Sequence, residues 1–173
     1  MCGRYYVEPE SDMAELAELI AEAKRKSEEV KTGEVFPSDT AAVIANNRQL
    51  KPTVFPMRWG FERRGGGLVI NARSETAAEK QLFRESAQLR RCLIPASCYF
   101  EWERRADGKV KYSIRPRGKE LLYLGGLYTK PEPGALPRSP SSPAKPPTAS
   151  ASSMTVCRSS CRRKRRPTGS RSR

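Results

Sequence analysis

Residues 97–115, SCYFEWERRADGKVKYSIR, consist of two strand-like runs on either side of a tight turn. The pair Asp107-Gly108 is a strong signal for a short β-hairpin loop when apolar residues alternate on both sides of it. We therefore expect CYFEW (98–102) and KYSIR (111–115) to pair as antiparallel neighbours. This hairpin is the clearest pointer to the fold class, because it indicates an antiparallel sheet rather than a set of βαβ units.

Short strand-like runs continue on both sides of the hairpin, at 41–45, 53–57, 68–72, 92–96 and 121–128. Two helices complete the set. Residues 11–30 carry an apolar stripe with Ser11 as a candidate N-cap, and a second helix is expected over about 76–89. Many short strands with two helices predict an α+β fold whose core is a largely antiparallel β-sheet. We place this domain at residues 1–128.

Residues 129–173 have a different composition from the rest. They contain eight of the fourteen prolines, ten serines, no aromatic residue, and eleven Lys or Arg against one acid. A segment of this kind buries too little apolar surface to offset chain entropy, so we expect a disordered C-terminal tail rich in Pro, Ser and Arg. Its run RRKRR (162–166) is open to two interpretations, a nucleic-acid-binding arm or a product of a shifted reading frame.

Composition also excludes several classes of site. The 173 residues contain no histidine and five cysteines, with no CxxC pair, so we expect no metal site, no His-based catalytic triad and no cofactor. No apolar run approaches a membrane span and no signal-peptide pattern opens the chain, which predicts a cytoplasmic protein with no membrane partner. We expect a monomer.

The chain opens MCGRYY, with a cysteine directly behind the initiator methionine. Once Met1 is removed, Cys2 carries a thiol and a free α-amine on neighbouring carbons. The amine can condense with an aldehyde to an imine, and the thiolate can then close onto the imine carbon to give a thiazolidine. The alternative is that Cys2 is simply a small second residue.

Three further stretches carry candidate site residues. In FPMRWGF (55–61), Arg58 beside Trp59 suits contact with a phosphate and stacking on a base, unless Trp59 belongs to the core. In INARSET (70–76), alternation along a strand places Asn71, Arg73 and Glu75 on one face, which is either functional or merely solvated.

The third stretch is SCYFEWER (97–104), in which Glu101 stands between Phe100 and Trp102. Aromatic neighbours on both sides would partly desolvate the carboxyl and suit it to general acid/base work. The alternative is an ordinary glutamate on the exposed face of a strand.

Taken together, these motifs resemble the SOS-response-associated peptidase (SRAP) family, whose domains process abasic sites in DNA. The resemblance covers about residues 1–128 and rests on MCGRY, EVFPSD (34–39), PMRWG, INARSET, RRCLIPA (90–96), YFEW and YLGGLY. It implies an SRAP-type fold with a barrel-like core. It also implies that Met1 is removed by a peptidase-like self-processing step, after which Cys2 crosslinks covalently to the ring-opened aldehyde of an abasic site in single-stranded DNA.

The resemblance assigns roles residue by residue. Cys2 matches the nucleophile, Asn71 the residue that positions the amine and sugar, and Glu101 the proton-transfer group. The residues that match the DNA channel, with Trp102 added beside Glu101, are Arg4, Arg58, Trp59, Arg73 and Trp102. The implied partner is single-stranded DNA containing abasic sites, with the protein associated with the nucleoid when bound.

One family motif, His-Asp-Arg-Met-Pro, is missing. Residues 153–161, SMTVCRSSC, can nevertheless be written in codons that translate as His-Asp-Arg-Met-Pro-Val-Val-Leu after regrouping by one base. We hypothesise a frameshift between about Leu127 and Ser139. The alternatives to an active protein are an inactive, C-terminally incomplete SRAP domain and a non-catalytic basic nucleic-acid-binding protein.

Overall fold

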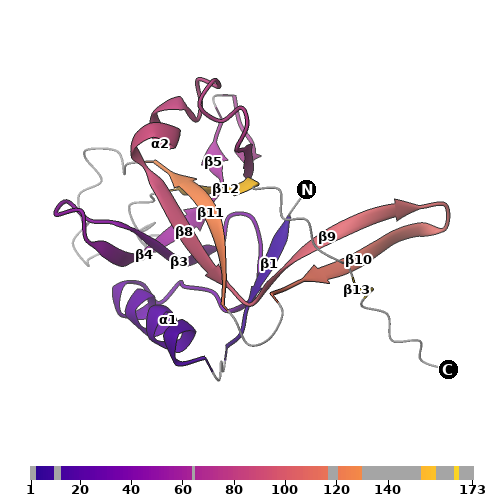
Figure 1. The fold of residues 1–173 in the computed structure, drawn as a ribbon, viewed down its shortest axis with the longest axis horizontal. Coiled ribbons are helices and arrows are strands. Elements are labelled where there is room, and N and C mark those ends of the chain that lie inside the picture. The colour runs from indigo at the N-terminus through magenta and orange to yellow at the C-terminus, as the bar shows by residue number, and fades with distance from the viewer. Residues whose placement is uncertain are drawn as a thin grey trace, which may run out of the picture.

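Two larger β-sheets, a two-stranded ribbon and two helices make up the computed structural model, which describes residues 3–9, 13–63, 65–116, 121–129, 153–158 and 166–167 (Figure 1). Most strand pairs are antiparallel, and the two exceptions both involve β12. The α+β prediction is confirmed.

The first sheet has five strands in the order β13-β10-β9-β1-β2, and all its pairings are antiparallel. Its strands are β1 (Arg4–Val7), β2 (Gly33–Val35), β9 (Cys98–Arg105), β10 (Gly108–Ile114) and β13 (Arg166–Pro167). The predicted hairpin is confirmed, with Arg105 paired to Gly108 across a two-residue turn. Gly108 has φ +138°, a conformation that favours glycine. The β9–β10 hairpin extends well beyond the body of the domain (Figure 1).

The second sheet follows the order β11-β8-β3-β4-β12-β7, and β11 also pairs with β12, so that the sheet closes on itself. The closed second sheet forms the barrel-like core. Its strands are β3 (Thr40–Asn46), β4 (Pro52–Trp59), β7 (Asn71–Arg73), β8 (Arg91–Ala96), β11 (Leu122–Tyr128) and β12 (Ser153–Arg158). A separate ribbon pairs β5 (Phe61–Glu62) with β6 (Leu68–Val69).

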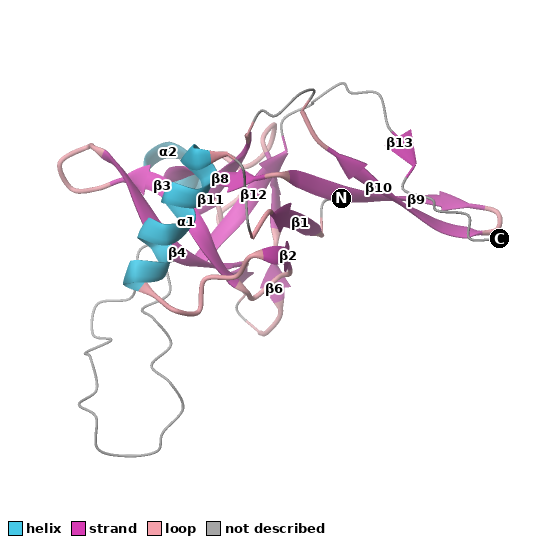
Figure 2. Cartoon of the chain, turned by 90° about the horizontal axis from the view of Figure 1, so that it is seen from below, coloured by secondary structure: helices cyan, strands magenta, loops and turns pink. Residues whose placement is uncertain are grey.

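Helix α1 (Ala14–Lys26) packs beside β3 and β4 through the predicted stripe, with Leu16, Ile20 and Ala23 buried (Figure 2). Its N-cap is Met13, and Ser11, the N-cap candidate predicted from the sequence, lies outside the described residues. No helix in the described part of the chain is long and apolar enough to cross a membrane.

Helix α2 (Arg84–Leu89) is much shorter than the helix expected over 76–89. Residues 74–83 form a series of turns, and several of their backbone bonds span three residues, as from the Thr76 amide to the Arg73 carbonyl at 3.2 Å. The helical prediction fails there because turns, rather than a continuous i→i+4 ladder, satisfy the backbone.

The main core lies between the two sheets and α1. Its largest fully buried side chains are Trp59, Tyr5, Leu16, Ile94 and Val35, each less than 2% exposed. Burying aromatic and branched side chains from both sheets stabilises their mutual arrangement, at roughly 25 cal/mol per Å² of apolar surface. The core therefore fixes where β1 and β9 lie relative to β4 and β7.

Parts of the segment 129–173, which was expected to be disordered, form the strands β12 and β13. β12 pairs in parallel with β4 and β7, and β13 pairs with β10. Apart from Thr129 and these two strands, the segment 129–173 lies outside the described residues.

Candidate nucleic-acid interface

Cys2, the predicted nucleophile, lies outside the described residues, which begin at its neighbour Gly3. Directly after Gly3 comes β1, which is held between β2 and β9, with Arg4 opposite Phe100 and Tyr5 opposite Tyr99. Apart from its chain neighbours, no described residue has a heavy atom within 4 Å of a Cβ built on Gly3, so the described part of the chain leaves the space beside it open. Strand β1 is thus paired along both edges, and Gly3, just ahead of it, has open space beside it.

Glu101 is half-buried on β9 and faces Tyr112 of β10 across the hairpin. Side chains alternate along a strand, so Phe100 and Trp102 project from the opposite face of the sheet to Glu101. Their rings lie there with centroids 6.4 Å apart and planes tilted by 59°. The expectation that these two aromatics flank and desolvate the Glu101 carboxyl is wrong, because sequence neighbours in a strand are not spatial neighbours.

Arg4 and Trp102, two of the predicted DNA-binding residues, are brought together on that opposite face. The Arg4 guanidinium carbon lies 5.4 Å from the Trp102 ring centroid and 4.6 Å from that of Phe36. Lys111 Nζ lies 3.8 Å from the Phe100 centroid and 6.0 Å from that of Trp102. We call this group the cation–aromatic cluster; its members are Arg4, Glu34, Phe36, Phe100, Trp102 and Lys111.

Glu34 of β2 is the acid in the cation–aromatic cluster. One of its oxygens accepts from Arg4 Nη1 at 3.4 Å and the other from Lys111 Nζ. The hydrogen bond from Lys111, helped by the charges of Lys111 and Arg4 and opposed by partial burial, lowers the pKa of Glu34 below its usual 4.5. Glu34 is therefore ionised at neutral pH.

Trp59 is a core residue. Its side chain is 0% exposed, its ring centroid lies 5.2 Å from that of Tyr5, and its Nε1 donates to the Ile70 carbonyl at 2.9 Å. A ring without exposed surface presents no face to a base, so the structure corrects the assignment of Trp59 to the DNA channel. Trp59 instead connects β1, through Tyr5, to the start of β7.

Asn71 and Arg73 share one face of β7, as alternation predicted, because the intervening Ala72 is buried. Asn71 is half-buried and directly follows Ile70, whose carbonyl Trp59 holds. Arg73 is exposed at the end of the strand, and Glu75 lies beyond it in a turn. Asn71 and Arg73 belong to the second sheet, whereas Arg4, Glu101 and Trp102 belong to the first. Glu75, expected on the same strand face, lies outside the strand.

Arg58 is engaged locally. Its Nε donates to the Ser38 carbonyl at 3.2 Å, and its Nη1 lies 4.0 Å from a Glu62 oxygen. The side chain is 38% exposed, so part of the guanidinium remains accessible to an anion. An exposed ion pair at this distance contributes little stability and is readily exchanged for another partner.

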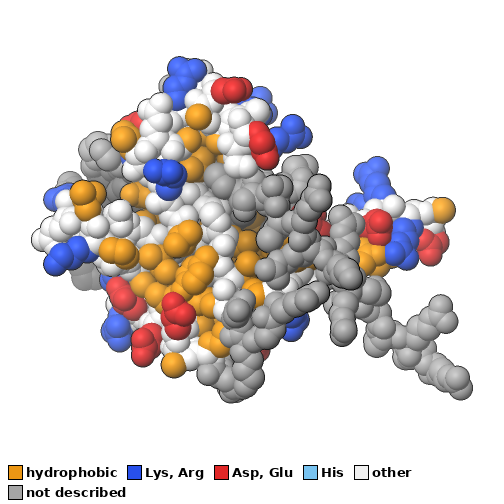
Figure 3. Space-filling view, in the orientation of Figure 1, with side chains coloured by type: hydrophobic (Ala, Val, Ile, Leu, Met, Phe, Trp, Pro, Cys, Tyr) orange, Lys and Arg blue, Asp and Glu red, His pale blue; other side chains and the backbone are white. Residues whose placement is uncertain are grey.

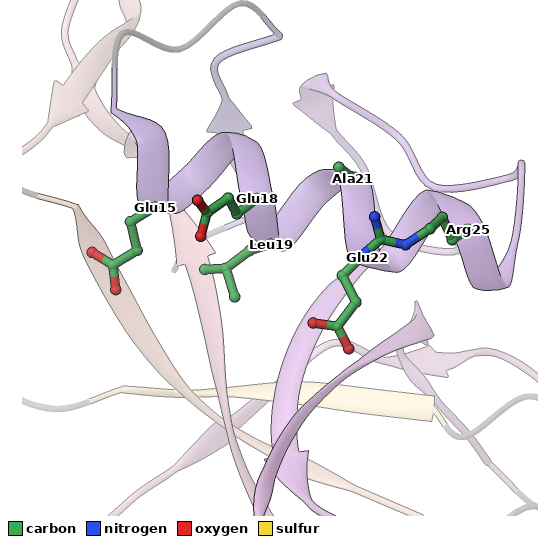
Figure 4. Close-up of a pocket in the computed structure, with 6 residues that line it drawn as sticks. All are labelled: Glu15, Glu18, Leu19, Ala21, Glu22 and Arg25. Carbon is green, nitrogen blue, oxygen red and sulfur yellow. The ribbon is translucent and has the colours of Figure 1, made fainter.

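The outer surface of α1 has a shallow hollow of about 350 Å³ (Figure 4). Its lining is Glu15, Glu18, Leu19, Ala21, Glu22 and Arg25, with three carboxylates and one guanidinium. None of the predicted site residues lies there, and the excess of acids would repel phosphate. On the face shown in Figure 3, Lys and Arg side chains lie both on the body and on the projecting hairpin, where Asp and Glu side chains accompany them.

Four members of the cation–aromatic cluster were not predicted as site residues from the sequence: Glu34, Phe36, Phe100 and Lys111. Each stands in a motif that the sequence does show, EVFPSD for the first two, SCYFEWER for Phe100 and KYSIR for Lys111. Their proximity depends on β2 and β10 both flanking the β1–β9 pair, which no local pattern encodes.

The sequence of this chain matches the SRAP family, described as SOS response associated peptidase, over residues 1–163. The chain therefore belongs to the SRAP family. The prediction drawn from MCGRY, PMRWG, INARSET and YFEW is confirmed at the level of the family.

Named relatives are 34% identical to this chain. They include "Abasic site processing protein YobE" of Bacillus subtilis, aligned over 142 residues that make up 75% of this chain and 62% of the relative. "Abasic site processing protein YoqW" of Bacillus phage SPbeta aligns over 75% of this chain and 61% of its own length. The chain thus spans about three fifths of the length of these relatives.

Solved structures share the fold. A phage-related protein from Bordetella bronchiseptica superposes with a TM-score of 0.60 at 20% identity, covering 90% of this chain and 68% of that one. A second protein from the same organism gives a TM-score of 0.53 at 22% identity, over 74% of this chain and 64% of that one. At these identities the likeness establishes the fold alone.

Proposed function

We propose that this chain processes abasic sites in single-stranded DNA by forming a covalent thiazolidine crosslink through Cys2. The observation that carries the proposal is the MCGRY motif placed directly ahead of β1. That strand is anchored by pairing on both edges, and open space lies beside Gly3. The names of the 34% identical relatives support the same activity.

The chemistry needs only the aminothiol and a proton-transfer group. Removal of Met1, by the protein's own peptidase-like activity, frees the Cys2 amine. The amine adds to the C1′ aldehyde of the ring-opened abasic sugar, and loss of one water gives an imine. The thiolate then forms a C–S bond to the imine carbon while the nitrogen takes up a proton. The closed ring has no free aldehyde, so the elimination that cleaves the strand is prevented.

Glu101 and Asn71 assist this reaction in the proposal. Glu101 stands on β9, the direct partner of β1, and its carboxyl would deliver the proton that lets water leave. Asn71 stands where the Trp59–Ile70 hydrogen bond fixes the start of β7, which suits an amide that orients the amine and the sugar.

DNA would be held by cations and by a half-buried ring. Arg4 and Trp102 form one contact surface in the first sheet, and Arg58 and Arg73 offer further cations in the second. Arginine with an aromatic ring suits a single strand, since phosphates pair with the cation and unstacked bases stack on the ring. We propose that the protein acts as a monomer in the cytoplasm, associated with the nucleoid when bound.

Crosslinking to a single-stranded oligonucleotide with one abasic site tests the proposal. The mature chain should give a product that survives denaturing electrophoresis without any reducing agent. Cys2→Ser keeps the amine but loses the thiol, so its product should need borohydride to be trapped. Insertion of one glycine ahead of Cys2 keeps the thiol on the next residue and should abolish the stable product. Equal crosslinking by all three chains would refute the proposal.

A second candidate function is non-covalent nucleic-acid binding, favoured by the formal net charge of +14. Electrostatic binding of this kind depends steeply on salt and needs no aminothiol. Salt-sensitive retention of DNA by the mature chain, with no covalent product at any time point, would select this candidate.

A further inference from the structure

The cation–aromatic cluster joins four neighbouring strands on one face of the first sheet. Arg4 comes from β1, Glu34 from β2, Phe100 and Trp102 from β9, and Lys111 from β10. Phe36 directly follows β2. Within this group the Trp102 ring lies within 6.0 Å of both cations, and Glu34 bonds to both of them.

This geometry points to Glu34 as a positioning residue for DNA binding: we propose that its carboxylate holds Arg4 and Lys111 beside the Trp102 ring, where both contact the phosphates of a single strand. The inference rests on the proposed function, since it takes single-stranded DNA as the ligand. Neither Glu34 nor Lys111 was assigned a role by the motifs that identified the family.

The positive charges of Arg4 and Lys111 repel each other, so a further interaction is needed to hold them close together. Arg4 and Lys111 side chains are 40% and 33% exposed, so water and salt compete for them and each has other conformations available. Glu34 offsets their repulsion by bonding each cation through a different oxygen. The aromatic rings beneath favour the same placement, because a cation over a ring face is attracted by the ring quadrupole.

The resulting surface matches the chemistry of a single strand. Two cations carry more positive charge than one carboxylate neutralises, so the cluster has a net charge of about +1 toward a phosphate. The Trp102 ring beside them is the flat, half-buried group on which an unstacked base can lie. Phosphate and base contacts would thus be made side by side.

A positioning role predicts an effect opposite in sign to simple electrostatics. If Glu34 were merely an acid near the DNA, removing its charge would strengthen binding to a polyanion. If Glu34 positions two cations, Glu34→Gln should weaken binding even though the chain gains a positive charge. The two interpretations therefore separate on direction alone.

The experiment uses the full chain and an undamaged single-stranded oligonucleotide, so that no aldehyde is present and only reversible binding is measured. Affinity is determined across a salt series for wild type, Glu34→Gln and the control Asp107→Asn. Asp107 is exposed in the hairpin turn, and its variant makes the same change of charge. For single strands the slope of log affinity against log salt changes by about 0.7 for each phosphate contact.

We expect Glu34→Gln to bind about threefold or more weakly, with a salt slope shallower by about 0.7 or more, and Asp107→Asn to bind as tightly as wild type or tighter. Lys111→Gln should also lose about 0.7 of slope, and combining it with Glu34→Gln should add little. Glu34→Gln binding tighter than wild type would overturn the inference. If Glu34→Gln does not fold, Lys111→Gln with an unchanged slope would overturn it instead.

These outcomes are distinct from failure of the proposed function. Wild type that binds undamaged DNA but forms no crosslink to abasic DNA refutes the covalent chemistry and leaves the role of Glu34 to the salt series. Wild type that crosslinks, together with a Glu34→Gln variant that binds more tightly, refutes only the role of Glu34.

Discussion

Replacing Trp59 by phenylalanine should destabilise the protein without weakening its binding to DNA. The change removes the indole donor that bonds the Ile70 carbonyl at 2.9 Å and trims a ring that is 0% exposed. Loss of one partly buried hydrogen bond costs about 1–2 kcal/mol, and the space left in the core adds about 1 kcal/mol. We expect the free energy of unfolding to fall by about 2–3 kcal/mol, which lowers Tm by roughly 5–10 °C.

The matched comparison is Trp102→Ala, on the half-buried ring of the cation–aromatic cluster. Stacking on a base is worth about 1–3 kcal/mol, so this variant should bind undamaged single-stranded DNA roughly 5- to 150-fold more weakly with little change in Tm. Thermal melts and affinities measured on both variants check the pair of predictions. A Trp59→Phe variant with wild-type Tm and weakened DNA binding would show that our placement of Trp59 in the core is wrong.

Three further predictions follow from the site. Glu101→Gln should lower the crosslinking rate by a factor of about 10²–10⁴ and change DNA affinity little, because a proton donor assists imine formation without holding the strand. Single-turnover rates and DNA affinities measured on the same variant check this. Equal losses in rate and affinity would make Glu101 a binding residue. The Lys111 hydrogen bond lowers the pKa of Glu34 from its usual 4.5, so the stability that Glu34 contributes should be present above pH 4.5 and lost as pH falls through the lowered pKa. The difference in unfolding free energy between wild type and Glu34→Gln should therefore shrink from pH 7 to pH 3. A difference that stays constant over this range would contradict the prediction. The gene should show codons for residues 153–161 that regroup by one base to His-Asp-Arg-Met-Pro-Val-Val-Leu. A protein restored to that reading frame should have a higher Tm and a higher crosslinking rate. Codons that cannot be regrouped in this way would refute the frameshift hypothesis.

Most of the strands could be predicted from the sequence because turn residues and apolar runs mark them locally. The Asp107-Gly108 signal predicted the β9–β10 hairpin, whose two-residue turn is Ala106 and Asp107, and apolar runs located β3, β4, β8 and β11 to within a few residues. β1 and β2 were missed, although RYYV alternates in burial as a strand should. Both are only three or four residues long, and their partners are distant in sequence, so pairing rather than propensity defines them.

The candidate site was only partly predictable. Motif resemblance predicted roles for Arg4, Asn71 and Glu101, but it could not distinguish a tryptophan in the core from one at the surface. Trp59 and Trp102 both stand beside charged residues in the sequence, and only the packing of the two sheets makes Trp59 fully buried. The same limit applies to Glu34 and Lys111, which are 77 residues apart in sequence.

The strand β12 matters for any truncation of the chain. It pairs with β4, β7 and β11, and the pairing with β11 closes the second sheet. Without β12, the edges of β4 and β11 would face solvent, and unpaired sheet edges promote aggregation. Deletion variants should therefore be judged by their solubility before any loss of activity is interpreted.

The central claim is that Cys2 carries the covalent chemistry, and mass spectrometry of the crosslinked protein tests it most directly. After crosslinking to an abasic single strand and digestion with trypsin and nuclease, the account predicts the sugar remnant on the peptide of residues 2–4, Cys-Gly-Arg, without Met1 and without prior reduction. The mass should equal peptide plus ring-opened sugar remnant minus one water. A remnant found on a lysine elsewhere, or a peptide that still begins with Met1, would contradict the account.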